Sequence, residues 1–337
     1  MTGLLVNLNS TLKLVTRSFC DVDDWTEFLK TTGRHIQVDQ LSLHPFRVDA
    51  WLLDFGNLLV GFAKYGCPMH QVGERRQHFI HFDVLLEVGP GANHVGGSPI
   101  HTDHLFSFDF QRSSDTVLSA GTLIGDVLVE QDLFTATCHA MRRDDINYRF
   151  LRGDVAYLPT SLMLYQGYLR ELFTLLKERS PLLQSPEYRQ MIIGDLLPLL
   201  IDAIPRQKSK FLHPPAPSHR AKLICRAREF IQANLHRPLT LKDIYTELGI
   251  SRRTLYYGFE NIFGMTPMEY LKAQRLQGVW RSLKQADPRT AQVTAIAHQW
   301  GFWSMSHLAR DYKAQFEELP SETLAQTPID KQYKQFS

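Results

Sequence analysis

The chain has 337 residues, of which 44% are hydrophobic and 21% charged, and this balance excludes a disordered protein and indicates about two globular domains. Its net charge of +2 conceals an uneven distribution: residues 1–205 carry 17 basic against 24 acidic residues, whereas residues 206–325 carry 18 against 10. An acidic front and a basic back are typical of a sensor joined to a phosphate-seeking module, and they argue against a structural nucleoid protein.

Cysteine usage and hydropathy bear on the compartment. The four cysteines show no CxxC or CxH spacing, which predicts reduced thiols in a cytoplasmic protein; they are Cys20, Cys67, Cys138 and Cys225. The longest apolar run, Met191 to Ile204, is interrupted by Asp195, Pro198 and Asp202. We therefore expect neither a signal peptide nor a membrane-spanning helix.

The first 161 residues are predicted to form a β-rich domain. A short strand at Leu4–Val6 and a helix at Asp23–Thr31, capped by Asp21 or Asp23, come first. Period-two runs then predict strands at Phe46–Phe55, Leu58–Tyr65, Phe79–Val88, His104–Phe110 and Leu133–Met141. Repeated short strands separated by Gly, Pro, Asn or Asp favour an antiparallel barrel or jelly roll of the cupin kind, although other sandwiches fit the same pattern.

Such a barrel encloses a cavity for a small molecule, and its histidines raise the question of a metal. The candidates lack an HxH pair and a following Glu; they are His78, His81, His94, His101 and His104. We therefore predict no metal, no cofactor and no catalytic residue, and interpret these histidines as surface or core residues. The pairs Arg75-Arg76 and Arg142-Arg143 are interpreted as solvated loop charges rather than substrate clamps.

Two helices are predicted in residues 162–204. The first runs from Leu162 to Glu178 with apolar residues at helical spacing, namely Leu164, Tyr168, Leu172, Leu175 and Leu176. The second runs from Pro186 to Ile204 and carries Met191, Ile192, Leu196, Leu199 and Leu200. These stripes fit dimerisation and packing on the barrel equally well. Residues 205–217, rich in Pro and basic residues, are predicted to be an interdomain linker.

The basic half contains one helical signal twice. After a predicted helix at His219–Leu235, the stretch from Leu239 to Leu271 matches that from Val293 to Leu324. The matched pairs, offset by 52 and then 53 positions, are Ile244 with Ile296, Leu248 with Trp300, Gly249 with Gly301, Ser251 with Ser304, Leu255 with Leu308, Phe259 with Tyr312, Phe263 with Phe316 and Pro267 with Pro320. Each copy predicts a short helix, a Gly turn and a second helix with a Ser N-cap, which together form a helix-turn-helix unit.

The outward faces of the two second helices suit the major groove of DNA. In the first copy this face offers Arg253, Tyr256 and Tyr257, and in the second it offers Ser306, Ala309 and Arg310. We predict that these six side chains contact bases. Contacts to the DNA backbone or flanking positions are predicted for Ser251, Arg252, Lys242, Lys272, Arg275, Ser304, Met305 and His307. A helix pair in an ordinary core is the alternative for each copy taken alone.

These features resemble the DNA-binding domain of AraC/XylS-type transcription regulators over about Ser218 to Leu324. The resemblance rests on the two units, the bridging helix Met268–Lys284, and matching residues at Gly264, Pro267, Tyr270, Arg275-Leu276, Gly301-Phe302, His307 and Pro320. Glu317 stands where the family often has Gly, and Trp303 where a smaller or polar residue is commoner. The WGFW run at Trp300–Trp303 is similar to a subgroup that includes ethanolamine-operon-type regulators.

The resemblance implies an α+β chain that acts as a sequence-specific transcription regulator, more often an activator than a repressor. Its partners would be double-stranded promoter DNA, RNA polymerase, a small-molecule effector and a second subunit. The expected organisation is a cupin-like sensor at 1–161, a helical and dimerising region at 162–204, a linker at 205–217, a double helix-turn-helix domain at 218–325 and a mobile tail at 326–337. The competing interpretation is a cupin-type enzyme with an appended DNA-binding domain.

Overall fold

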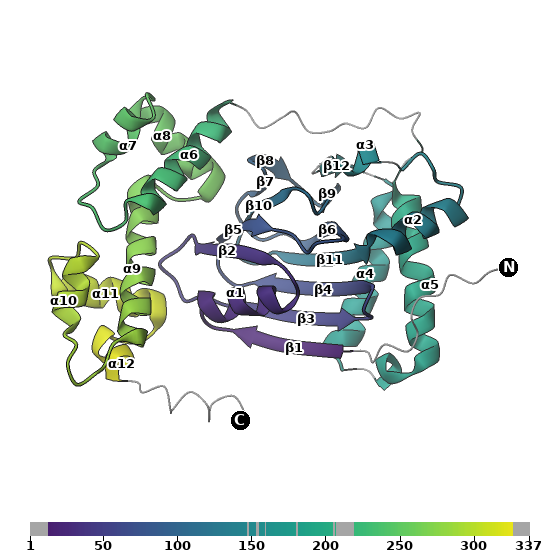
Figure 1. Ribbon diagram of the computed structural model, residues 1–337, viewed down its shortest axis with the longest axis horizontal. Coiled ribbons are helices and arrows are strands. Elements are labelled where there is room, and N and C mark those ends of the chain that lie inside the picture. The colour runs from purple at the N-terminus through teal and green to yellow at the C-terminus, as the bar shows by residue number, and fades with distance from the viewer. Residues whose placement is uncertain are drawn as a thin grey trace. The chain divides into compact units, whose positions relative to one another are not determined.

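The computed structural model describes residues 13–325 except 147, 153, 154, 159, 180, 205 and 207–218 (Figure 1). By its internal contacts the chain divides into two units. The first consists of residues 1–38, 47–66 and 70–218, and the second of residues 39–46, 67–69 and 219–337. The expected strand Leu4–Val6, nearly all of the expected linker 205–217 and the tail 326–337 lie outside the described residues.

The strands occupy the first part of the chain and form two sheets. The described strands are β1 (Lys13–Phe19), β2 (His35–Gln40), β3 (Val48–Asp54), β4 (Leu58–Tyr65), β5 (Met69–Glu74), β6 (Phe79–Glu87), β7 (Asn93–Val95), β8 (Ser98–Ile100), β9 (His104–Phe108), β10 (Ser113–Leu118), β11 (Leu123–Glu130) and β12 (Val155–Tyr157). One sheet has the order β1-β3-β4-β11-β6-β9-β12 and the other β2-β5-β10-β7-β8.

Antiparallel pairing fixes which side chains of the larger sheet share a face. Asp126 on β11 lies opposite Gly61 on β4 and opposite Asp83 on β6. His81 stands two residues before Asp83 on the same strand, so the two side chains project to one face. Register thus brings two carboxyl groups and an imidazole to one side of the sheet.

Helices complete the first unit and share its core. They are α1 (Val22–Thr31), α2 (Gln131–Ala140), α3 (Tyr148–Leu151), α4 (Leu162–Lys177), the 3₁₀ turn η1 (Pro181–Gln184) and α5 (Pro186–Ala203). The predicted cap of α1 is confirmed, since the Asp21 carboxylate accepts a hydrogen bond from the amide of Asp24 at 2.8 Å. Buried residues of α4 and α5, such as Leu169 and Leu196, join strand residues such as Val127 in one hydrophobic cluster.

One sequence expectation about these elements is wrong. Leu133–Met141, expected as a strand, lies mostly within α2, because Leu133, Phe134, Thr137 and Cys138 form the buried side of a helix. The apolar stripe predicted for α4 is divided: Leu172 and Leu176 are buried, whereas Leu164 is 78% exposed.

Two arginines expected in solvent are buried instead. Arg75 is 3% exposed, and its guanidinium donates a hydrogen bond to the carbonyl of Asp109 at 2.8 Å. Arg143 is 2% exposed, pairs with Asp145 at 2.9 Å and donates to the carbonyls of Ile201 and Ile204. Those carbonyls lie at the end of α5, where helix carbonyls lose their usual amide partners, although that of Ile201 also accepts from the Ile204 amide at 3.2 Å. Arg143 therefore caps a helix that lies 58 residues away in the chain.

The second unit is helical. Its helices are α6 (His219–Ala233), α7 (Leu241–Glu247), α8 (Arg252–Phe263), α9 (Pro267–Gln285), α10 (Val293–Gln299), α11 (Met305–Phe316) and α12 (Pro320–Ala325). In Figure 1, α6 to α8 lie towards one end of α9, and α10 to α12 towards the other. Antiparallel sheets followed by a helical region confirm the expected α+β class.

Candidate nucleic-acid interface

The first helix-turn-helix unit is closed by short-range hydrogen bonds. Thr240 and Asp243 form a reciprocal capping box at the start of α7, and Gly249 takes a left-handed φ of 62° in the turn. The predicted cap of α8 is confirmed, because the Ser251 hydroxyl accepts from the amide of Thr254 at 3.0 Å. Leu255 and Phe259 are fully buried on the inner face of α8. The opposite face of α8 is therefore presented outward.

The second unit repeats this backbone with different side chains. Gly301, with φ of 80°, follows α10, and Ser304 is the N-cap residue of α11, although its hydroxyl makes no capping hydrogen bond. The C-cap residues of α8 and α11 are both left-handed: Gly264 follows α8 at φ of 68°, and Glu317 follows α11 at φ of 62°. The repeat detected in the sequence is thus a repeat of turns and caps.

The long helix α9 holds the two units through close packing. Thr266 and Glu269 form a capping box at its start. A Cβ added at Gly278 would lie 2.2 Å from the ring of Trp300, so only Gly allows the indole to approach this side of α9. The Trp300 indole also donates to the hydroxyl of Ser282 at 3.0 Å. These contacts fix the end of α10 against α9.

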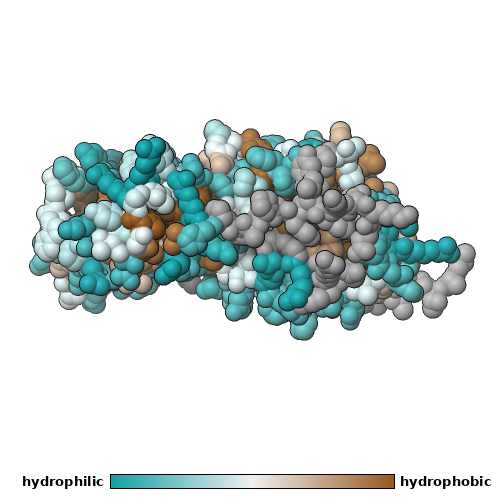
Figure 2. Space-filling view, turned by 90° about the horizontal axis from the view of Figure 1, so that it is seen from above, coloured by the Kyte–Doolittle hydropathy of each residue, from teal (hydrophilic) through white to brown (hydrophobic). Residues whose placement is uncertain are grey.

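The outward face of α8 carries the three side chains of the first unit that are predicted to contact bases. Tyr256 and Tyr257 are 36% and 47% exposed, and Arg253 is exposed beside them. The Arg253 guanidinium lies 5.2 Å from the centre of the Tyr257 ring, and the two tyrosine rings are 6.5 Å apart. Lys242 and Arg252 are also exposed. From above, the surface over α6 to α8 is mostly hydrophilic or neutral (Figure 2).

The outward face of α11 is less basic. Ser306 and Arg310 are exposed and Ala309 is half-buried, while the flanking Ser304 and His307 are exposed and Met305 is half-buried. Arg310 forms an ion pair with Asp311 at 3.1 Å, with 70% of its side chain still exposed. The positive charge of Arg310 on this face is therefore partly offset by the neighbouring carboxylate.

Two residues predicted to contact the DNA backbone are engaged inside the second unit. The Arg275 guanidinium donates to the carbonyl of Leu235 at 2.8 Å and to that of Arg237, and partial burial lowers its pKa. The Lys272 ammonium lies 3.1 Å from the carboxylate of Asp311. These contacts tie α9 to the end of α6 and to α11. Among the predicted basic backbone contacts, Lys242 and Arg252 are the ones whose side chains project into solvent.

Trp303 is a prominent exposed residue beside the outward face of α11. It immediately precedes the cap of α11, is 76% exposed and stacks on the His298 ring with centres 4.9 Å apart. The sequence marked Trp303 only as a departure from the pattern of the family that the chain resembles.

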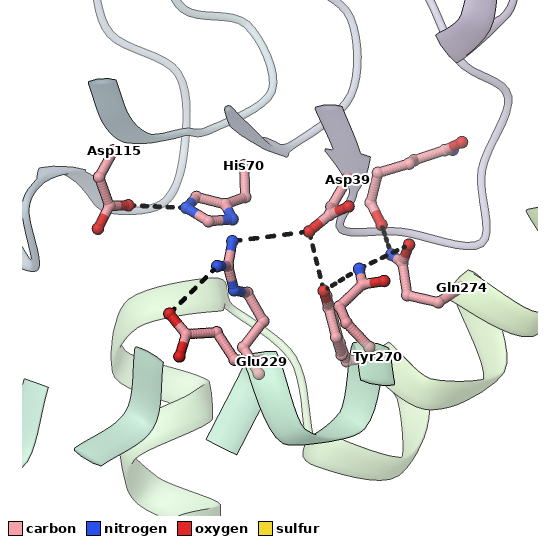
Figure 3. A network of polar contacts seen from close by, with 9 residues as sticks. Asp39, His70, Asp115, Glu229, Tyr270 and Gln274 are labelled. Carbon is pink, nitrogen blue, oxygen red and sulfur yellow. Dashed lines mark hydrogen bonds and ion pairs between the residues drawn. The ribbon is translucent and has the colours of Figure 1, made fainter. Parts of the chain in front are cut away.

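A buried polar network lies within the second unit (Figure 3). The Tyr270 hydroxyl on α9 donates to the Asp39 carboxylate at 2.9 Å and accepts from the Gln232 amide at 2.7 Å. Arg228 on α6 lies 3.8 Å from the same carboxylate. The side-chain amide of Gln274 donates to the carbonyl of Gln40 at 3.1 Å. Residues 39–46 are therefore an integral part of the fold that carries the two reading helices.

Within the described ranges, no three His, Cys, Asp or Glu side chains are grouped closely enough to hold a metal ion. No helix in the same ranges has both the length and the apolar character needed to cross a bilayer. The first unit does contain a cavity of about 60 Å³, lined by residues of both sheets and of α1.

Comparison with known proteins identifies relatives of the second unit. A helix-turn-helix domain family matches residues 244–326. The chain is 39% identical over 103 residues to the probable thc operon regulatory protein of Rhodococcus erythropolis, covering 31% of each chain. It is 34% identical over 101 residues to the XylDLEGF operon transcriptional activator of Pseudomonas putida, covering 30% of this chain and 32% of the relative.

A solved structure shows the same restricted overlap. A probable AraC family transcriptional regulator from Rhodopseudomonas palustris CGA009 is 38% identical to this chain, covers 31% of it and 94% of its own length, and has a TM-score of 0.29. The chain spans about a third of the length of the curated relatives named above.

Proposed function

We propose that the chain, whose helix-turn-helix region resembles that of AraC/XylS-type transcription regulators, reads a promoter with α8 and α11 under the control of a small molecule. The observation that carries this proposal is a pair of helix-turn-helix units on one shared helix, each with an exposed reading face. A relative that shares this region is named a transcriptional activator. We propose activation, with RNA polymerase as a partner, for this chain too.

The dimensions of α9 support simultaneous reading of two grooves. Its 19 residues span about 28 Å at 1.5 Å per residue. Successive major grooves on one side of DNA repeat about every 34 Å. Units carried near the two ends of α9 are therefore suitably spaced. Because the α8 face is basic and aromatic and the α11 face is mostly small and polar, the site bound by one chain should be non-palindromic.

Base reading is tested by replacing Arg253. We expect Arg253→Ala to weaken binding to the cognate site by about 1–3 kcal/mol, or roughly 5- to 150-fold, with little change on random DNA. Arg289→Ala is a matched control, since Arg289 is exposed in the loop after α9 and pairs with Asp287 at 2.9 Å. Footprints and titrations on both DNAs give the two affinities. An equal loss on cognate and random DNA would reduce Arg253 to a phosphate contact.

Phosphate contacts have a different signature. We expect Lys242→Ala or Arg252→Ala to weaken cognate and random binding alike, and to reduce the slope of log K against log salt by about 1. Lys272 and Arg275, which are held inside the unit, should instead act through stability. Thermal unfolding of each variant separates these two effects.

A homodimer through α4 and α5 is proposed from exposed apolar side chains. Met163 and Leu164 on α4 are 66% and 78% exposed, and Met191 on α5 is 45% exposed. Sedimentation of the full chain should show a dimer at micromolar concentration, and Leu164→Glu should shift it towards monomer. A wild-type monomer would refute the dimer without touching the DNA-binding proposal.

The effector is proposed to bind in the cavity of the first unit. Aromatic side chains of Trp25, Trp51 and Phe62 line it together with polar and charged groups. A mostly enclosed site with a few convergent polar groups is the usual form of a small-molecule site. Repeating the footprint with candidate metabolites tests whether occupancy changes DNA binding.

A further inference from the structure

The cavity of the first unit contains a pair of buried carboxyl groups. Asp83 on β6 and Asp126 on β11 stand directly opposite each other in the antiparallel register. Side chains in such positions have Cβ atoms only about 5 Å apart. Burial, followed by the charge of Asp126 and a side-chain hydrogen bond between the two groups, holds the pKa of Asp83 well above its usual range, so this carboxyl group binds a proton more readily than an exposed aspartate does.

Each carboxyl group uses one oxygen within the protein and leaves the other unused. The Oδ2 atom of Asp126 accepts from the Arg34 guanidinium, and Oδ2 of Asp83 accepts from the Ser107 hydroxyl. Among the described residues, the Oδ1 atoms of both Asp83 and Asp126 are buried without a hydrogen-bond partner. Ser107 holds an unusual φ of 89° for a residue with a side chain, and such strain clusters at functional positions.

His81 supplies an independent third acceptor. It is 3% exposed, lines the same cavity, and its Nε2 atom is buried without a partner. The ring also makes a hydrogen bond to the backbone of Arg76 that favours the protonated ring. This bond comes from the Nδ1–H group, because Nε2 is unpartnered. Burial lowers the pKa of His81 to about 3, so the ring is neutral near pH 7 and Nε2 keeps its lone pair as an acceptor.

A ligand of this cavity has to match three hydrogen-bond acceptors, namely the two carboxyl groups and the imidazole nitrogen, and can replace one proton of the carboxyl pair. A primary ammonium has three N–H donors and one positive charge, which match two carboxylates and an imidazole nitrogen. A hydroxyl has a single donor and leaves two acceptors unsatisfied. A carboxylate ligand would face two like charges, and the nearby guanidinium of Arg34 is already paired with Asp126. The donor count therefore favours an amine.

The size and the walls of the cavity define the rest of the ligand. Since one water molecule needs roughly 10–15 Å³ of such volume, about 60 Å³ accommodates four to six non-hydrogen atoms. Trp25, Trp51 and Phe62 provide apolar surface on which a short carbon chain can pack. A compact ligand with one polar end and one apolar end fits both properties.

We propose that this cavity binds a small primary ammonium, whose N–H groups bridge the Asp83 and Asp126 carboxylates and reach Nε2 of His81. The inference rests on the proposed function, since it names the class of effector that the first unit takes. On binding, the proton shared by the carboxyl pair leaves to solvent and the ammonium replaces it. The ligand keeps all of its own protons, so charge and atoms balance.

Proton release makes the affinity depend on pH. The ionisable groups around the pair come from several elements: Arg34 before β2, Tyr65 on β4, Arg75 after β5, His81 on β6 and Tyr165 on α4. Burial raises the pKa values of both tyrosines and lowers that of His81, so these three groups stay neutral as the pH changes around 7. Displacement of a proton predicts that Kd falls as the pH rises, by up to about tenfold per pH unit.

The test is calorimetric titration of the full chain with propan-1-amine, propan-1-ol and propanoate. We expect only the amine to bind, with release of close to one proton at pH 7 when buffers of different ionisation enthalpy are compared. Asp83→Asn should lose the proton release and weaken binding at least tenfold. Asp132→Asn, on the exposed first turn of α2, is the matched control and should behave as wild type.

Each outcome has a defined reading. Equal affinity for the alcohol, or amine binding without proton release in the wild-type chain, overturns the inference, and neither result depends on how a variant folds. The footprint without ligand is scored separately. Sequence-specific DNA binding without amine binding would leave the proposed function standing and refute the ammonium. A wild-type chain that does not bind DNA sequence-specifically would refute the proposed function itself.

Discussion

Glu317 occupies a backbone position that suits glycine, and replacing it should stabilise the second unit. It ends α11 at φ of 62°, and its amide donates to the Lys313 carbonyl at 3.0 Å. The left-handed conformation costs a residue with a side chain about 1–2 kcal/mol. Glycine avoids that cost but loses about 0.5–1 kcal/mol more conformational entropy on folding. Glu317→Gly should therefore gain roughly 0.5–1 kcal/mol.

The repeat supplies a reciprocal variant for this prediction. Gly264 ends α8 at φ of 68°, with an amide that donates to the Glu260 carbonyl at the same 3.0 Å. Calorimetry of the full chain should show the transition of the second unit rising by about 2–8 °C in Glu317→Gly and falling in Gly264→Glu. An unchanged or lowered transition in Glu317→Gly would refute the claim that this cap is strained.

Two further changes test packing and burial. Gly278→Ala places a Cβ 2.2 Å from the Trp300 ring and should destabilise the second unit by about 1–3 kcal/mol. Gly194→Ala in α5 is the control, because no atom lies near the added carbon, and it should be neutral or stabilising. Thermal unfolding measures both effects. Burial lowers the pKa of His81 to about 3 in the folded chain. Between about pH 6.5 and pH 3 this ring is therefore protonated in the unfolded chain and neutral in the folded chain. The free energy of unfolding should fall by up to about 1.4 kcal/mol per unit as pH drops from 6.5 towards 3, and His81→Gln should reduce that slope; an identical slope would contradict the assignment.

Short-range signals in the sequence predicted the second unit well. Ser251, Gly249 and Gly301 specify caps and turns through their own side chains and backbone freedom, so their roles can be inferred without tertiary information. The same holds for Asp21 at the start of α1. Hydrophobic spacing alone gave the wrong element for Leu133–Met141, because a helix with two adjacent buried pairs resembles a buried strand over nine residues.

Long-range pairing could not be read from the sequence. Arg143 is buried because carbonyls 58 and 61 residues away end a helix beside it, and no local pattern announces that partner. The cavity is a similar case. His81 was weighed as a metal ligand and interpreted as a surface or core residue, and Asp83 and Asp126 were not singled out, since strand register alone brings them together. Their chemistry is visible only after the sheet is assembled.

The contact between α6 and α8 has a mechanical consequence. A Cβ added at Gly258 of α8 would lie 2.3 Å from the end of the Ile224 side chain on α6, so the two helices are in close contact at this point. The longest segment of the second unit begins at the start of α6, at His219. A force on α6 would be carried into α8 through this contact, and would thereby shift the outward face that holds Arg253.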